Sequence, residues 1–332
     1  MFTIPKRALL AIPAIALVLA SAACSGGGKA PDTTSSAGGG GQVADTPRLK
    51  IAMISHAPTG DAFFDTIIHG AEAAAAKDNV DFQYSGDGDV TKQATLVQTA
   101  IDAKVDGIAV SIPNPDALRP VILKAKEAGI PVIAYNAGDR DWQSTGALSF
   151  YGEPELLSGQ VTGEQMNKLG YKHALCVVQA QGQVQLEDRC AGIKDKFTGK
   201  SDEIFANGTD TSAYVSTIKA KLASDPSIDA VVTLGPALGV AVANEVKSSG
   251  AKAAVVTYAM NNDVYPLLAS GDIAFTIDQQ PWLQGYMSVD SLWFYKKNGT
   301  ILGANQSIAT GPVILDKTNS AQVQEHAKAG DR

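Results

Sequence analysis

The feature that most constrains the fold is a regular alternation of short apolar runs with amphipathic stretches, which begins at residue 49. The apolar runs are rich in β-branched residues and nearly continuous, as expected for strands that helices cover on both faces. In the first half we expect strands at 49–55, 81–86, 107–112, 131–136 and 147–152, and helices at 64–77, 91–103 and 116–128. This order predicts a doubly wound parallel α/β sheet.

A second series of similar length repeats the pattern. It predicts strands at 173–179, 203–208, 230–234, 253–259 and 273–278, and helices at 156–169, 188–197, 213–223 and 238–249. We therefore expect two α/β domains, and one more helix at 281–299 indicates that the chain returns to the first of them. Several chain crossings between two lobes form a hinge rather than a loose linker. The predicted boundaries are 48–150 plus about 280–310 for the first lobe, 151–279 plus about 311–325 for the second, and 326–332 for a polar tail.

The amino terminus has the pattern of a secretory signal that ends at a cysteine. Lys6 and Arg7 precede an apolar run at 8–20, and small residues lead to Cys24. This run is shorter than the ~20 apolar residues of a membrane-spanning helix. The pattern resembles a bacterial lipoprotein signal, so we expect a signal peptide at 1–23, lipidation of Cys24, and a flexible tether at 24–47 that anchors the protein at the outer face of the cell membrane. The alternative is an ordinary signal peptide in which Cys24 has no role.

The charge and the motifs exclude several classes of protein. The formal charge is −7, and removal of residues 1–23 takes away two basic residues and no acid, which leaves −9. Without basic clusters, nucleic acid is not an expected partner. No nucleophile-elbow, zinc-protease or dinucleotide motif is present in the sequence, so we expect neither an enzyme nor a bound cofactor.

Two further cysteines, Cys176 and Cys190, lie 14 positions apart. In an exported protein, this even pair predicts a disulfide. The alternative is two buried free thiols. We do not expect a metal site, because His173 is the only nearby candidate for a further ligand.

Ligands of open α/β sheets bind beyond the carboxyl ends of the strands. At these positions the sequence places amides, carboxylates and aromatic rings, and it lacks the glycine-rich loop and lysine that phosphate requires. Amides and carboxylates hydrogen-bond hydroxyl groups, and a ring covers the C–H face of a sugar. The candidate ligand-binding residues are His56, Asp61, Phe63, Phe64, Asn136, Glu187, Arg189, Asp210, Asn261 and Gln279. We therefore expect a small neutral carbohydrate or polyol as the ligand.

Four segments resemble the type I periplasmic binding proteins of the ribose/galactose kind, which serve ABC importers. They are GDAFF at 60–64, IPVIAYN at 130–136, LEDRCAG at 186–192 and AFTIDQQPWLQGY at 274–286. The resemblance implies two lobes that close on a sugar and deliver it to an importer permease. We expect the protein to act as a monomer.

The resemblance also implies roles for individual residues. Phe63 and Phe64 match the aromatic clamp, Asp61 a hydroxyl-binding position, Asn136 the polar residue after the fourth strand, and Gln279 a glutamine at the hinge. In addition, Glu187 and Arg189 lie in a helix start that supplies charged ligand contacts.

Four positions depart from the ribose-type pattern. Asn136 and Ala137 stand where Asp and Arg are usual, Gly235 replaces Asn, and Ala259 replaces Asp. The loss of charged contacts argues against ribose and favours a differently shaped neutral ligand such as a sugar alcohol. Asn261 or Asn262 could replace the missing Asp if their loop turns inward.

Structural roles are open for several candidates. Phe63 and Phe64 could be core residues at a helix start, His56 could form a local hydrogen bond, and Arg189 could pair with Asp188 or Glu187. At the level of function, the alternative to an importer subunit is an extracytoplasmic sensor that feeds a membrane signalling protein.

Overall fold

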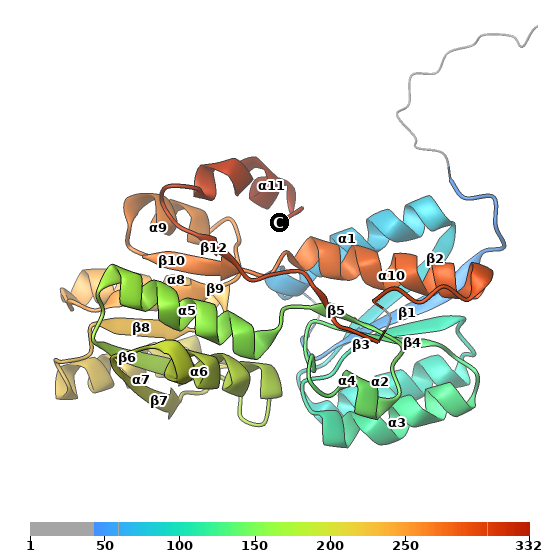
Figure 1. Cartoon of the computed structure of the whole chain (residues 1–332), viewed down its shortest axis with the longest axis horizontal. Coiled ribbons are helices and arrows are strands. Elements are labelled where there is room, and N and C mark those ends of the chain that lie inside the picture. Colours follow the sequence, from blue (N-terminus) through green and yellow to red (C-terminus); the bar gives the residue numbers. More distant parts are fainter. Residues whose placement is uncertain (1–42, 59, 304) are drawn as a thin grey trace, which may run out of the picture. The chain divides into compact units, whose positions relative to one another are not determined.

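The computed structural model describes residues 43–58, 60–303 and 305–332. The predicted signal peptide, Cys24 and most of the predicted tether lie outside the described residues. In the part described, the chain forms two six-stranded sheets, each covered by helices on both faces (Figure 1). No helix in this part is long and apolar enough to cross a membrane.

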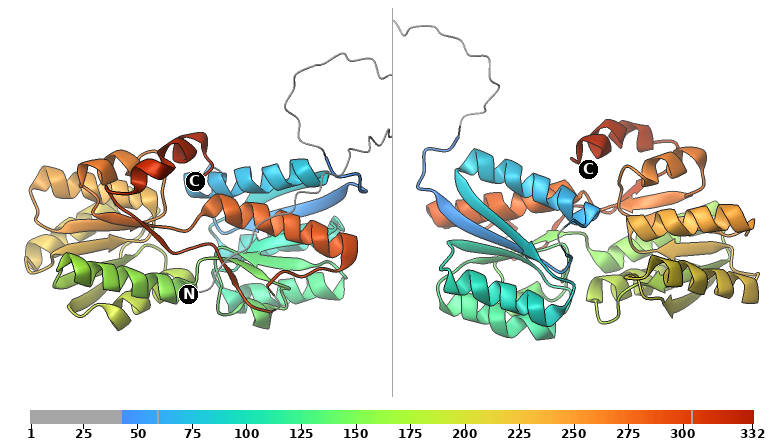
Figure 2. Two further views of the ribbon diagram at one scale, coloured as in Figure 1. Left: turned by 45° about the horizontal axis from the view of Figure 1, so that its top comes forward. Right: turned by 180° about the vertical axis from the view of Figure 1, so that it is seen from behind.

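The first lobe is built on a parallel sheet with the strand order β11-β5-β4-β3-β1-β2. Its strands are β1 (Leu49–Ser55), β2 (Val80–Gly86), β3 (Gly107–Ser111), β4 (Val132–Tyr135), β5 (Phe150–Gly152) and β11 (Ile308–Ala309). Two helices cover one face, α1 (Ala62–Asp78) and α10 (Pro281–Asn298), and two cover the other, α2 (Val90–Asp102) and α3 (Pro115–Glu127) (Figure 2). A short helix, α4 (Trp142–Thr145), precedes β5.

The second lobe repeats this arrangement with the strand order β12-β10-β9-β8-β6-β7, in which β12 alone runs antiparallel to its neighbour. Its strands are β6 (His173–Val178), β7 (Lys200–Phe205), β8 (Ala230–Thr233), β9 (Ala254–Tyr258), β10 (Phe275–Asp278) and β12 (Val313–Leu315). One face carries α5 (Glu155–Leu169) and α6 (Val184–Lys196). The other carries α7 (Thr211–Ser224), α8 (Pro236–Ser249), α9 (Val264–Ser270), the 3-10 turn η1 (Ser320–Val323) and α11 (Gln324–Ala329).

Three short segments connect the lobes: 153–154 after β5, 279–280 after β10, and 310–312 between β11 and β12. The prediction of two doubly wound α/β lobes joined by a hinge of several crossings is therefore confirmed.

Glycines allow one helix pair in each lobe to pack very closely. A Cβ on Gly70 of α1 would overlap the carbonyl of Trp282 in α10, and one on Gly285 would overlap the backbone of α1. Gly159 of α5 and Gly192 of α6 make the same kind of close approach in the second lobe. Both helix pairs therefore depend on the absence of a side chain at the contact.

The predicted disulfide is confirmed, and the alternative of two free thiols is wrong. Cys176 in β6 and Cys190 in α6 are both buried, and their Cα atoms lie 5.8 Å apart. The bond joins β6, the neighbour of the edge strand β7, to the helix that follows it.

Several elements differ from the sequence prediction, among them β5, which begins at Phe150 rather than at 147, and α6, which begins at Val184 rather than at 188. Strand β7 begins at Lys200 rather than at 203, because residues 200–205 pair in register with β6 although several of them are polar and exposed at the sheet edge. Helix α9 was not predicted, since seven residues are too few to show a periodic pattern. The segment predicted as a polar tail contains most of α11, which buries Ala327 against the second lobe.

Candidate functional site

The carboxyl edges of the two sheets meet through direct contacts between loops and helix starts. The backbone N–H of Val184 donates to the carbonyl of Pro113 at 3.0 Å. Arg140, which follows β4, forms an ion pair of 2.6 Å with Asp188 of α6. These contacts place the loops after the strands of one lobe against those of the other, which is where ligands of open α/β sheets bind.

His56 follows β1 and is held in place by the neighbouring strand. Its Nδ1 lies 2.9 Å from the hydroxyl of Ser111, and the same hydroxyl accepts its backbone N–H. Its ring meets the edge of Phe64 at 5.1 Å, and its Nε2 lies 3.4 Å from the amide nitrogen of Gln185 in the second lobe. Burial, together with the positive charge of Arg189, lowers the pKa of His56 to about 4.

The start of α1 combines a cap with two aromatic rings. The carboxylate of Asp61 accepts the backbone N–H groups of Phe63 at 3.0 Å and Phe64 at 3.3 Å, so Asp61 is the N-cap. Phe64 is 5% exposed and belongs to the core between the first sheet and its helices. Phe63 is half-buried and meets Phe64 edge to face. Of the two rings predicted to form the clamp, Phe63 is therefore the more accessible.

Asn136 and Gln279 lie at the hinge and are both buried. Asn136 adopts a left-handed backbone conformation, with φ of 62°, and its side-chain amide donates to Gln284 at 3.1 Å. The carbonyl of Gln279 accepts hydrogen bonds from Thr310 and Gln284. Its own side-chain oxygen has no donor among the described residues.

Arg189 is buried and forms a two-pronged ion pair with Glu155, one prong at 2.9 Å. Its Nη1 donates to the carbonyl of Leu234, and its guanidinium stacks 4.6 Å from the centre of the Tyr258 ring. Burial alone would lower the pKa of Arg189, but the carboxylate of Glu155 raises it above the ordinary value. The expected pairing of Arg189 with a neighbouring acid is thus observed, although the acid is Glu155 rather than Asp188 or Glu187.

A second carboxyl group, Glu153, lies beside this pair. It is fully buried, and neither of its oxygens has a hydrogen-bond donor among the described residues. The nearest guanidinium nitrogen, on Arg189, is 3.9 Å away. Burial, and then the charge of Glu155, raise the pKa of Glu153 well above its usual range.

The other predicted residues form local contacts at the surface. Asp210 caps α7 by accepting the N–H of Ala213 at 2.9 Å, and Asn261 accepts the N–H of Val264 at 2.9 Å. Glu187 is exposed and accepts the N–H of Gly182 at 3.2 Å. The structure therefore gives these three side chains local backbone partners.

Two glutamines that the sequence did not single out belong to the same region. Gln179 directly follows β6 and Gln185 is the second residue of α6, and the side-chain oxygen of each is buried without a hydrogen-bond donor among the described residues. The available signal was their place in the segment that follows a predicted strand. Nothing in the sequence distinguished them from other glutamines of the same loop.

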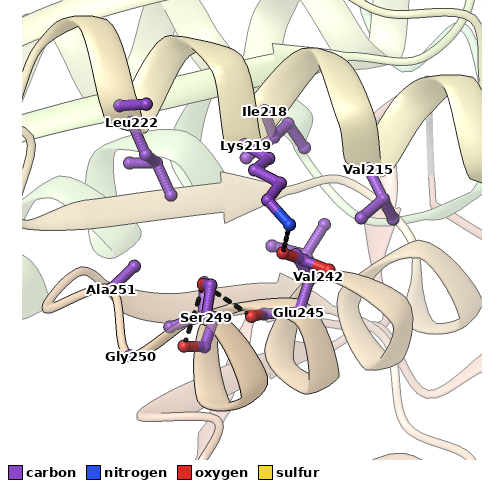
Figure 3. A pocket seen from close by; sticks show the side chains of 11 residues that line it. Val215, Ile218, Lys219, Leu222, Val242, Glu245, Ser249, Gly250 and Ala251 are labelled. Carbon is purple, nitrogen blue, oxygen red and sulfur yellow. Dashed lines mark hydrogen bonds and ion pairs between the residues drawn. The ribbon is translucent and has the colours of Figure 1, made fainter.

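A groove of about 290 Å³ lies elsewhere, between α7 and α8 (Figure 3). Its lining is largely apolar and includes an ion pair between Lys219 and Glu245 at 2.7 Å. It reaches Ser249, Gly250 and Ala251, which lead into the start of β9. This is the edge opposite the carboxyl ends of the strands, so the groove is not part of the candidate site.

One group of residues in the second lobe has metal-ligating side chains. The ligand atoms of His173, Asp202 and Asp225 all lie within 4.8 Å of one another. However, the ammonium group of Lys200 lies 2.9 Å from Asp202 and 3.9 Å from Asp225. Because the lysine already compensates negative charge here, these three side chains are not evidence for a metal site.

Two α/β lobes with polar strand ends in contact across a hinge define a solute-binding protein of the two-lobe class. The chain matches the family model of the periplasmic binding protein domain over residues 51–300, and it belongs to this family. The resemblance seen in the sequence is thereby confirmed.

Relatives with established names are sugar-binding proteins. The chain is 27% identical over 298 residues to the xylose/arabinose-binding protein XylF of Sulfolobus acidocaldarius, which covers 84% of this chain and 73% of that protein. It is 28% identical over 194 residues to a xylitol-binding protein of Mycolicibacterium smegmatis, over 54% of this chain and 53% of that one. A carbohydrate transporter from Acidothermus cellulolyticus, solved in complex with myo-inositol, is 48% identical with a TM-score of 0.84, over 86% of this chain and all (100%) of that one.

Proposed function

We propose that the protein captures a neutral sugar or sugar alcohol between its two lobes and delivers it to the permease of an ABC importer. The relatives named above are sugar- and polyol-binding proteins, which supports this class of ligand. The order of binding and delivery follows from the hinge, because contacts with both lobes favour the closed form.

The observation that carries the proposal is a set of three buried amide oxygens near the carboxyl edges of the sheets that have no donor in the described part of the chain. They belong to Gln179 and Gln185 in the second lobe and to Gln279 at the hinge. A buried acceptor without a donor costs about 1–3 kcal/mol, so such groups are rare unless a ligand satisfies them. Hydroxyl groups supply the missing donors and carry no charge. A polyol is therefore the ligand chemistry that fits these three side chains.

The charged groups at the contact between the lobes also favour a neutral ligand. Arg189, the cation that could bind a sugar acid, is already neutralised by Glu155. Glu153 adds a second acid, whose oxygens accept no hydrogen bond from the described residues and whose nearest guanidinium nitrogen, on the same Arg189, is 3.9 Å away. An anionic ligand would meet surplus carboxyl groups here, whereas a neutral ligand would not.

The particular polyol that we propose to test first is myo-inositol. The transporter that binds it in its crystal structure shares 48% of its residues with this chain. The departures from the ribose-type pattern at Ala137, Gly235 and Ala259 also support a ligand other than ribose. We assign ligand contacts to His56, Phe63 and the three glutamines, and we place Phe64 in the core.

We further propose that the mature protein begins at Cys24 and is held at the outer face of the cell membrane by a lipid on that residue. The signal pattern before Cys24 supports this, and the tether at 24–47 would give the two lobes access to a permease. A mutation of Cys24 to Ser should release the protein from the membrane fraction, as measured by fractionation and immunoblotting. Retention of that variant in the membrane fraction would contradict the anchor.

The ligand is tested by calorimetric titration of the purified two-lobe protein with myo-inositol, xylitol, xylose, ribose and glucuronate. We expect binding of at least one neutral polyol and none of glucuronate. Gln185→Ala should weaken the binding of the best ligand by about tenfold, the value of one lost hydrogen bond, whereas the exposed control Gln322→Ala should not. If only glucuronate binds, or if nothing does, the proposal is wrong.

A further inference from the structure

At the candidate site, the second lobe contacts the first through one short stretch of chain. These contacts join Val184 to Pro113, Gln185 to His56, and Asp188 to Arg140. The three second-lobe residues belong to the first two turns of α6. Gln179, whose amide oxygen is buried without a donor among the described residues, lies just before the loop that leads to this helix. Segment 179–189 therefore carries both the contacts with the first lobe and two of the proposed contacts with the solute.

The disulfide of Cys176 with Cys190 encloses this segment. Cys176 lies in β6, all of whose residues are buried, and Cys190 directly follows Arg189 in α6. The two cysteines are 14 positions apart, and their Cα atoms are separated by 5.8 Å. The bond thus ties the far end of the segment to the buried strand from which the segment starts.

The start of α6 is largely polar, so apolar packing gives it limited support. Of its first seven residues, Leu186 and Cys190 belong to the hydrophobic core beneath the helix, whereas Gln185 and Asp188 are buried polar side chains. The N-cap residue, Gln183, accepts no backbone N–H with its side chain in the part of the chain that the structure describes. One of the two apolar anchors of this helix start is therefore a half of the disulfide.

Helix α5 supports α6 at a different place. A Cβ on Gly159 would overlap the backbone carbonyl of Arg189, and one on Gly192 would overlap the carbonyl of Leu156. These close contacts lie at the end of segment 179–189 and beyond it. They leave the position of residues 184–188 to Leu186 and to the disulfide.

We propose that the disulfide of Cys176 with Cys190 is a positioning element of the solute site, which holds segment 179–189 in the form that the solute and the first lobe contact. This inference rests on the proposed function, since it concerns affinity for the solute. In the chain-entropy model a disulfide acts on the unfolded state and changes stability alone. A bond that also restrains the folded segment spares the solute the cost of ordering Gln179 and Gln185, so it raises affinity as well. Affinity and stability measured in the same variants separate the two roles.

The test compares the double variant Cys176→Ala/Cys190→Ala with Leu268→Ala. Leu268 is the matched control, because it is fully buried in α9 on the other face of the second sheet. Each variant should lower the midpoint of thermal unfolding by roughly 5–10 °C. Calorimetric titration at about 15 °C uses myo-inositol, or whichever neutral polyol of the panel binds tightest. The double variant should bind it about tenfold more weakly than the unmodified protein, and Leu268→Ala within about twofold.

A double-mutant cycle tests whether the loss of affinity passes through the segment. Gln185→Ala should weaken binding about tenfold with the disulfide present, but less than about threefold without it, because a loosened segment no longer presents this amide. Hydrogen exchange needs no solute: backbone amides at 182–190 should lose protection in the double variant, whereas those of β8 and α8 should keep it. If the double alanine variant does not fold, Cys176→Val/Cys190→Ala restores part of the buried volume and takes its place.

Two results would overturn this inference while leaving the proposed function intact. One is equal affinity of the double variant and Leu268→Ala for the solute. The other is an effect of Gln185→Ala that is the same with and without the disulfide. If no polyol of the panel binds to the unmodified protein, the proposed function fails. Unchanged hydrogen exchange at 182–190 in the double variant would overturn the positioning role whatever the ligand is.

Discussion

The two lobes share an architecture but differ in what they bury at the start of a helix. In the first lobe, α1 begins with Phe64 packed into the core, and its contact with α10 is made close by Gly70. In the second lobe, α5 begins with Glu155, which is buried in an ion pair with Arg189, and Gly159 brings α6 close. The corresponding helix start thus buries an aromatic ring in the first lobe and an ion pair in the second.

The difference indicates that the helix packing and the edge chemistry are set by separate residues. The glycines determine how near the helices lie, in the same way in both lobes. The residue in the first helical turn, Phe64 in α1 and Glu155 in α5, determines whether the helix start buries an apolar ring or an ion pair. A neutral solute between them can meet a ring from the first lobe and hydrogen-bonding groups from the second.

The largest loss of stability is expected at the ion pair between Glu155 and Arg189. Glu155→Gln leaves Arg189 buried without its carboxylate and should lower the free energy of unfolding by about 3–5 kcal/mol, measured in urea. Glu153→Gln is the matched control, because its oxygens have no donors among the described residues, and it should change stability by less than about 1 kcal/mol. Equal losses of unfolding free energy in the two variants would mean that the ion pair of Glu155 with Arg189 does not stabilise the second lobe.

A smaller effect is expected at the helix contacts, and it should be alike in the two lobes. Gly70→Ala and Gly159→Ala each force a methyl group into the backbone of the partner helix, so each should cost about 1–3 kcal/mol of stability. Gly129→Ala tests for loss of backbone freedom alone, because its added Cβ meets no atom within 4 Å although its φ is 76°. A gain in stability at either helix contact would refute close packing there.

The sequence was sufficient for most of the fold because buried parallel strands give long apolar runs. The run at 107–112 predicted β3, all of whose residues are buried, within one residue. The polar edge strand β7 shows no such run, and its start was predicted three residues late. The disulfide could be predicted because only two cysteines remain after Cys24.

The candidate site was less predictable, because its contacts join residues far apart in the chain. Strand ends indicated the edge at which the candidate site is proposed, but nothing in the sequence showed that Arg189 pairs with Glu155, 34 positions away. Likewise, the local capping roles of Asp61 and Asp210 look the same in sequence as a ligand-binding role. Gln179 and Gln185 become candidates only with coordinates, because their buried oxygens have no donor among the described residues and lie near this edge.

The smallest loss of stability is expected at the helix N-caps Asp61 and Asp210. Asp61→Ala and Asp210→Ala each remove a side chain that accepts backbone N–H groups, so each should cost about 1 kcal/mol of stability. Thermal unfolding measures this loss, and calorimetric titration measures whether binding changes as well. If Asp61 is a cap only, its replacement leaves solute affinity within about twofold; a much larger loss would make Asp61 a ligand contact.

The most direct measurement is a crystal structure of the protein grown with the tightest-binding neutral polyol. We expect one solute between the lobes, with hydroxyl groups within hydrogen-bond distance of the side-chain oxygens of Gln179, Gln185 and Gln279. A solute bound in the groove between α7 and α8, or one between the lobes that leaves these three oxygens without donors, would contradict it.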